Sequence, residues 1–299
     1  MPSRTIPLPT PKPFELRLCL FGHGWIALAP HNFDEATQTF TTVLRLGDKI
    51  ADATLRAANQ HELSLRLDCA DKLSAADTKL AAKQIVHMLR LDSDLTAFHA
   101  VCKGEPTLRW AHRRGAGRLL RSATVFEDLM KLLFTTNTTW SGTEAMTRNL
   151  VAACDSRAPS GARAFPSAAQ CVRDLSFYRD VVRTGYRAEA AQQLAEGFAT
   201  GTLTDAQFLQ QQTADELWDR ITSLRGFGPY AAGQAMRLLG HYEELALDSW
   251  CRAQFAEREG RKKAPADSTI EKRYAKFAPF QGLAMWIDLT AQWHGEAAK

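Results

Sequence analysis

Residues 213–251, TADELWDRITSLRGFGPYAAGQAMRLLGHYEELALDSWC, determine how the rest of the chain is interpreted. Thr213 is a good N-cap residue before apolar residues at helical spacing, and Gly226 and Gly228 then interrupt that helix. Pro229 suits the first position of a second helix, where its missing N–H costs nothing. The stretch therefore predicts two helices joined by a tight glycine turn.

The predicted turn offers an anion site. Backbone N–H groups between Gly226 and Ala231 would lack helical partners and lie at the positive end of the second helix dipole. Such groups suit a phosphate, and glycine lets the backbone approach it closely. An ordinary helical hairpin is equally compatible with Leu-x-Gly-Phe-Gly alone. The single aspartate that follows, Asp248, favours the DNA-binding interpretation.

Taken together, Leu224-Arg225-Gly226-Phe227-Gly228 and Asp248 resemble the helix-hairpin-helix (HhH-GPD) superfamily of DNA glycosylases, which carries such a hairpin followed by a catalytic aspartate. Residues 125–151 look like the family's helix-loop-helix that fills the gap left by an extruded base. Residues 185–188 look like its Gly-Φ-Arg-Ala helix start (Φ, apolar), and residues 273–293 resemble its closing helix. The resemblance covers the C-terminal two-thirds of the chain.

The resemblance implies a role for Asp248. Cleavage of an N-glycosidic bond gives the sugar oxocarbenium character, which a nearby carboxylate stabilises while it orients water. Asp248 precedes a predicted helix whose dipole favours its negative charge. A plain N-cap would be the interpretation without the hairpin upstream.

The residue at position 230 bears on the reaction type. Lyase-competent members of the family place a lysine just after the hairpin, where this chain has Tyr230, so monofunctional hydrolysis is expected. An aromatic residue there resembles the alkyladenine-type enzymes (3-methyladenine glycosylase II-like), which stack on electron-poor alkylated bases.

Other residues are assigned by the same resemblance. Asn137 falls where the 8-oxoguanine branch inserts an asparagine into the duplex, beside Thr138, and Trp140 is either a core residue or a wall of the base pocket. This departs from the alkyladenine pattern and leaves the substrate open. The remaining DNA-contacting positions are Gly226, Phe227, Gly228, Tyr230 and Ala231.

Cofactor expectations are few. The hairpin of the family often holds a monovalent ion, K⁺ or Na⁺, on backbone carbonyls, which here would be those of Thr222, Leu224 and Phe227. An iron–sulfur cluster is not expected, because the six cysteines contain no CxxC pair and none follows Cys251.

Bulk properties agree with a folded nucleic-acid-binding protein. The 299 residues are 45% hydrophobic with a net charge of +4, and no stretch is apolar enough for a membrane span. The run 109–121 holds five arginines without an acid and is interpreted as a solvated face, a DNA contact or a domain junction. The expected partner is double-stranded DNA with a damaged base, bound by a monomer in the bacterial cytoplasm (nucleoid-associated) or the eukaryotic nucleus.

The fold class is predicted as α+β. Residues 1–13 are expected to form an extended Pro-rich arm, residues 14–108 a small N-terminal antiparallel sheet domain with helices, and residues 109–299 a mostly helical glycosylase domain. Predicted strands lie near 14–20, 25–29, 39–46, 49–57 and 63–67. The domain is interpreted as a scaffold, with His23, His31, His61, His87 and His99 as isolated surface or packing residues.

Three rival functions stay open. An oxidised-purine (8-oxoguanine-type) glycosylase would share the fold and release a different base. A non-catalytic DNA-binding module would keep the hairpin without turnover. An unrelated helical scaffold would bind protein and not DNA.

Overall fold

The computed structural model describes residues 2–210 and 213–296, so residue 1 of the predicted arm and residues 211–212 and 297–299 of the predicted helical domain lie outside it. In this described part, five antiparallel strands form one sheet in the order β1-β5-β4-β3-β2. The strands are β1 (Ser3–Pro9), β2 (Asn32–Asp34), β3 (Thr39–Leu46), β4 (Lys49–Asn59) and β5 (Glu62–Cys69). The α+β class and the three strands predicted within 39–67 are confirmed.

The first thirty residues differ from the prediction. The Pro-rich segment is an edge strand, β1, which pairs along its whole length with β5; the edge position tolerates prolines because no neighbour needs their missing N–H. The predicted strand at 14–20 is instead helix α1 (Leu16–Leu20), and 25–29 is largely the 3₁₀ turn η1 (Gly24–Ala27). Leu16, Leu18, Cys19 and Leu20 are all buried, so the alternation of leucines carried no information about period.

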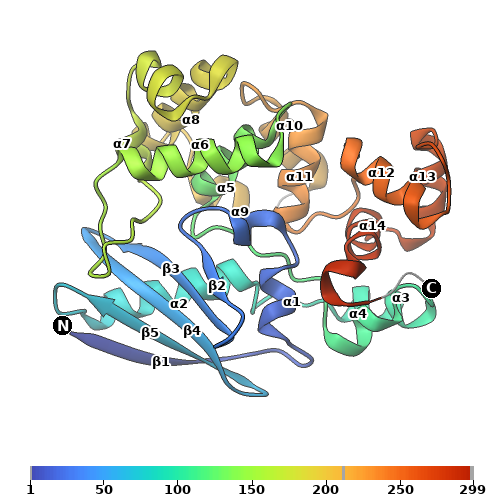
Figure 1. The fold of residues 1–299 in the computed structure, drawn as a ribbon, viewed down its shortest axis with the longest axis horizontal. Helices are drawn as coiled ribbons and strands as arrows, with labels where there is room; N and C mark the ends of the chain where they lie inside the picture. The colour runs from blue at the N-terminus through green and yellow to red at the C-terminus, as the bar shows by residue number, and fades with distance from the viewer. Residues whose placement is uncertain (1, 211–212, 297–299) are drawn as a thin grey trace.

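The sheet is backed by α2 (Ala75–Leu89), whose N-cap Ser74 forms a capping box with Asp77. The next helices, α3 (Thr96–Gly104) and α4 (Arg109–Arg114), pack on each other and lie beside the C-terminal helices (Figure 1). Phe98 contacts Phe280, with ring centroids 5.8 Å apart. The predicted boundary between residues 108 and 109 thus falls between two packed helices.

The rest of the chain is helical. It comprises α5 (Val125–Thr135), α6 (Trp140–Ala153), α7 (Ala168–Cys171), η2 (Phe177–Val182), η3 (Gly185–Arg187), α8 (Ala188–Thr200), α9 (Asp205–Leu209), α10 (Ala214–Thr222), α11 (Pro229–Leu239), α12 (Ser249–Arg258), α13 (Asp267–Tyr274), η4 (Ala275–Phe277), α14 (Gln281–Leu289) and η5 (Ala291–His294). Helix α5 is buried along most of its length and packs against α6, α8 and α11. Thr124 caps α5, and the N–H of the nearby capping-type residue Ser122 donates to Asp128.

The arginine-rich run 109–121 is largely internal. Arg118 and Arg121 are buried and donate to the carbonyl oxygens of Ser93 and Leu238. Arg114 pairs with Glu15 and Glu296. The guanidinium groups of Arg114 and Arg118 therefore join the sheet region to the helical region, as expected of a domain junction.

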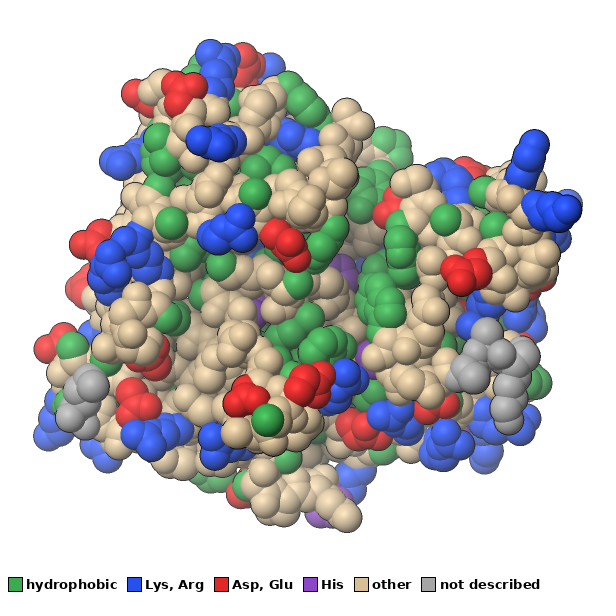
Figure 2. Space-filling view, viewed as in Figure 1, with side chains coloured by type: hydrophobic (Ala, Val, Ile, Leu, Met, Phe, Trp, Pro, Cys, Tyr) green, Lys and Arg blue, Asp and Glu red, His purple; other side chains and the backbone are tan. Residues whose placement is uncertain are grey.

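The molecule is hollowed on one face (Figure 2). The hollow lies between α6, α10 and α11 on one side and α12 and α14 on the other, with hydrophobic and histidine side chains at its bottom. Among the described helices, none is long and apolar enough to cross a membrane.

Candidate active site

The hairpin forms as predicted. Thr213 caps α10 in a capping box with Glu216, and Pro229 is the first residue of α11. Gly226 has φ +86°, and a Cβ there would lie 2.7 Å from Leu133 Cδ1 of α5. Glycine therefore suits position 226 for two reasons: the backbone there is left-handed, and α5 packs too closely for a side chain. Gly228 caps α11 in open space.

Some of the predicted DNA-contacting groups are not available to a ligand. The side chain of Phe227 is buried, and its N–H donates to the Leu224 carbonyl at 3.1 Å. The side chain of Ala231 is buried as well. What remains is the exposed backbone of Gly226 and Gly228 and the first turn of α11, where N–H groups have no intrahelical acceptor.

Asp248 directly precedes α12, as predicted, and is its N-cap: its Oδ1 accepts the Cys251 N–H at 2.7 Å. Helix α11 holds the loop before it: Arg237 donates to the Leu245 carbonyl and Gln234 to the Ala246 carbonyl. Ala246 adopts φ +49° against Gly233, where a Cβ would lie 2.7 Å from that of Ala246. The carboxylate position is thus set by α11 and by the cap of α12.

Tyr230 lies near this carboxylate. Burial raises the pKa of Tyr230 to about 12, and the negative charge of Asp248 contributes to that rise. Arg237 is fully buried, and burial lowers its pKa from the ordinary value. Its guanidinium lies 5.1 Å from the ring centroid of Trp286. The site therefore combines one half-buried carboxylate, one neutral phenol and one buried cation.

Three tryptophans from the last helices form one wall. The ring centroid of Trp250 lies 5.6 Å from that of Trp286 and 5.3 Å from that of Trp293. Trp286 is buried, whereas Trp293 is 37% exposed, so the wall runs from the interior to the surface. Helical spacing in the sequence does not show whether Trp250 and Trp286 line a pocket or fill the core.

The N-terminal segment packs against this wall, which the sequence interpretation missed. The His23 ring lies 4.3 Å from the Trp25 ring and 5.7 Å from the Trp286 ring, centroid to centroid. Trp286 Nε1 donates to the Gly22 carbonyl at 2.8 Å, and Trp25 Nε1 to Asp128 Oδ1 at 2.7 Å. The Gly22-His23-Gly24-Trp25 string was the available signal, since two glycines around a histidine allow other groups to approach closely.

Trp140 and Asn137 lie at the turn between α5 and α6. Trp140 is 43% exposed, and a Cβ on Gly24 would come within 2.6 Å of its Cη2. Asn137 is exposed with φ +44°, and Thr138 beside it is exposed too. The buried Arg187 donates to the Asn137 carbonyl at 3.1 Å and also to Thr136. Arg187 therefore fixes a turn that presents Asn137 to solvent.

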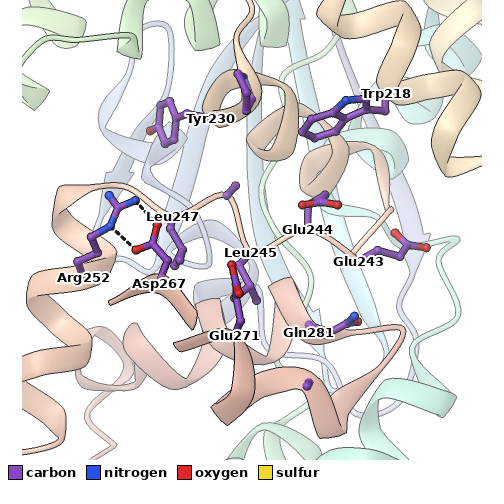
Figure 3. Close-up of a pocket in the computed structure, with 13 residues that line it drawn as sticks. Trp218, Tyr230, Glu243, Glu244, Leu245, Leu247, Arg252, Asp267, Glu271 and Gln281 are labelled. Carbon is purple, nitrogen blue, oxygen red and sulfur yellow. Dashed lines mark hydrogen bonds and ion pairs between the residues drawn. The ribbon is translucent and has the colours of Figure 1, made fainter. Parts of the chain in front are cut away.

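A cavity of about 430 Å³ lies behind the loop that precedes Asp248 (Figure 3). Glu243, Glu244 and Glu271 line it, and the Arg252–Asp267 ion pair, at 2.8 Å, borders it. Tyr230 lines this cavity, whereas Asp248 does not, and the carboxylates that line the cavity repel a polyanion. The hollow with the aromatic wall is therefore the better candidate for a nucleic-acid site.

Within the described residues, no cluster of His, Cys, Asp or Glu has metal-binding geometry. The predicted monovalent-ion site would use carbonyl oxygens, which are suitable hard donors. Of these, the Leu224 carbonyl already accepts the Phe227 N–H and retains one lone pair.

Comparisons with known proteins agree with the architecture. No protein-family model and no curated protein matches the sequence. The structure is similar to that of MBOgg1 in complex with a low-affinity DNA ligand, with a TM-score of 0.73 and 17% identity over 99% of this chain and 100% of that one. It is also similar to the 3-methyladenine DNA glycosylase from Archaeoglobus fulgidus, with a TM-score of 0.73 and 14% identity over 97% and 99%.

A third similar structure is the Clostridium acetobutylicum 8-oxoguanine glycosylase/lyase, with a TM-score of 0.70 and 14% identity over 95% of each chain. The three similarities cover both the sheet region and the helical region. The chain therefore has the fold of the helix-hairpin-helix DNA glycosylases, as the hairpin and the aspartate after it predicted.

Proposed function

We propose that the chain is a DNA glycosylase of base-excision repair that hydrolyses the N-glycosidic bond of a damaged purine flipped out of double-stranded DNA. The observation that carries this proposal is the placement of Asp248. Its carboxylate lies at the N-terminus of α12, next to an aromatic wall and near the hairpin residue Tyr230.

Asp248 would act on the sugar. Its Oδ1 is held by the Cys251 N–H, which leaves Oδ2 to face the anomeric carbon or a water molecule. A fixed carboxylate there stabilises the oxocarbenium character of the transition state and orients the attacking water. Arg237 is a positioning residue, since it acts through the Leu245 carbonyl.

The reaction is expected to stop at hydrolysis. Tyr230 occupies the position from which a lysine would form a Schiff base, and its raised pKa keeps the phenol protonated. Lys131 is buried and bonded to Glu127 and Ser122, so its amine is not free to attack a sugar. Release of the base without strand nicking follows.

The duplex would lie across the hairpin and the Asn137 turn. The backbone of Gly226, Gly228 and the first turn of α11 suits a phosphate. Asn137 would enter the space left by the flipped nucleotide, and Trp140 would border the base. A monovalent ion on the carbonyls of Thr222, Leu224 and Phe227 would hold the hairpin in shape; no catalytic step depends on it.

Two substrate classes fit this site. Tyr230 and the tryptophan wall support an alkylated purine, because such bases stack well and already have a weakened glycosidic bond. The exposed Asn137 supports an oxidised purine as the alternative. A third possibility, a DNA-binding module without turnover, would keep the same surface and lack activity.

The test is base release from duplexes that carry 7-methylguanine, 1,N⁶-ethenoadenine, hypoxanthine, 8-oxoguanine or uracil, with and without alkali. Asp248→Asn should reduce release at least about 100-fold, with DNA affinity retained, because the lost interaction is made chiefly in the transition state. Asp267→Asn is the matched control, since that carboxylate pairs with Arg252 at the other cavity.

Each result has a distinct meaning. Strand breakage only after alkali supports hydrolysis, whereas breakage without alkali would contradict the Tyr230 argument. DNA binding without release of any base would favour the non-catalytic module. Equal loss in Asp248→Asn and Asp267→Asn would remove the special role of Asp248.

A further inference from the structure

His23 is an unusual member of the aromatic cluster that includes Trp25 and Trp286. It is 6% exposed, and its Nδ1 has no hydrogen-bond partner in the described part of the chain. Its ring is packed between Trp25 and Trp286, which are aromatic and apolar. A buried polar atom left unsatisfied in such surroundings destabilises the fold by about 1–3 kcal/mol, so its retention calls for a reason.

The neighbouring groups do not provide a hydrogen-bond partner for His23 Nδ1. The indole N–H of Trp25 donates to Asp128, and that of Trp286 donates to the Gly22 carbonyl. The buried cations near it are also occupied: Arg237 donates to Gln234 and Leu245, and Lys131 to Glu127 and Ser122. Of the three packed rings, His23 alone therefore retains an unused polar atom.

His23 differs in location from other histidines that have a buried, unpaired nitrogen, such as the half-buried His31 and His87. His23 touches Trp286, the inner member of the tryptophan wall that begins beside Asp248. It also adjoins Gly24, over which Trp140 lies. A base that enters between Trp140 and the wall would meet the His23 imidazole at the bottom.

We infer that His23 is a specificity-determining residue of the proposed glycosylase, which reads an uncharged purine by a hydrogen bond from or to its neutral imidazole. The inference rests on the proposed function and names the class of base. A neutral imidazole offers one donor and one acceptor, and both kinds of group occur on purine edges. Discrimination by hydrogen bonding is stronger than discrimination by shape, because the wrong base leaves the buried group unpaired.

Two further observations favour an uncharged base. Burial and the cations Arg237 and Lys131 lower the pKa of His23 to about 3, so the ring is neutral at physiological pH. The Arg237 guanidinium already lies against Trp286, so a cationic base gains less from that ring than it would from a free tryptophan. His23 and Trp286 therefore favour a base that forms hydrogen bonds over a base that carries a positive charge.

The experiment compares His23→Phe, which keeps a planar ring without nitrogen, and His23→Gln, which keeps hydrogen-bonding atoms, with the wild type. Single-turnover base release is measured on duplexes with hypoxanthine or 8-oxoguanine, which are uncharged, and with 7-methylguanine, which is cationic. Affinity for duplexes with uncleavable 2′-fluoro analogues of the uncharged bases gives a readout apart from turnover. Thermal unfolding checks that each variant folds.

His23→Phe should release the uncharged base that the wild type processes about 10- to 100-fold more slowly, and it should lose affinity for that base to a similar extent. His23→Gln should recover part of this loss, and 7-methylguanine should show at most a small change. An equal loss for all bases, no loss for any, or a wild type that releases only 7-methylguanine would overturn the inference and leave the proposed function standing. A wild type that releases no base would overturn both.

Discussion

At the scale of single residues, Gly24 is important because the Trp140 side chain packs directly against it. A Cβ at this position would lie 2.6 Å from Trp140 Cη2, and Trp140 is exposed enough to swing into solvent. Gly24→Ala should therefore change the free energy of unfolding by less than about 1 kcal/mol. It should also displace Trp140 from the hollow and weaken binding of a duplex with a flipped base analogue about tenfold, by loss of stacking.

The measurement is the affinity for a duplex with an uncleavable damaged nucleotide, relative to an undamaged duplex. Gly104→Ala is the control, since a Cβ there meets nothing within 4 Å. Trp140→Ala should match Gly24→Ala, and the double variant should add little, because both remove one contact. Additive losses would mean that Trp140 does not act through its place over Gly24.

At the scale of elements, the two glycines of the hairpin have separable tasks. Gly226→Ala should destabilise the fold by roughly 1–3 kcal/mol, because its backbone is left-handed and its Cβ would meet Leu133. Gly228→Ala should fold normally, since its backbone is extended and its surroundings are open. Its added methyl group should still weaken DNA binding, because it stands where a phosphate approaches the α11 N-terminus.

Thermal unfolding separates the two variants, and the salt dependence of affinity for an abasic duplex tests the phosphate contact. A Gly228→Ala protein that binds DNA as the wild type does, with the same salt slope, would show that the hairpin is not the DNA-binding face. A Gly226→Ala protein of unchanged stability would contradict the packing argument.

The elements that could be predicted from the sequence are those with strong local sequence signals. The α10–α11 hairpin was predicted because Thr213, Gly226 and Pro229 are strong local signals of a cap, a break and a start. Helix α1 does not match its predicted strand because four of its five residues are buried, which leaves no clear amphipathic period. For β1, prolines indicate extended backbone, but pairing with β5 depends on a partner more than fifty residues away.

At the scale of the whole molecule, the hollow joins segments that no local pattern connects. Asp248 could be assigned from its spacing to the hairpin, whereas His23 and Trp286 are brought together by packing of the N-terminal segment on α14. The bond between Trp286 and the Gly22 carbonyl spans most of the chain. The N-terminal region is therefore part of the candidate site and not only a scaffold for it.

The same burial predicts how stability depends on pH. The folded pKa of His23 is about 3, below the ordinary 6.5, so the unfolded chain takes up a proton there first as pH falls. This histidine should thus destabilise the fold progressively below pH 6.5, by about 2 kcal/mol at pH 5. Burial raises the pKa of Glu127 and Asp128, which opposes the trend, so the prediction concerns a difference between variants.

His23→Gln should lose less stability than the wild type between pH 7.5 and 5.0 in urea unfolding, whereas the exposed His61→Gln should lose as much. Identical losses in all three proteins would mean that His23 is not held neutral by burial.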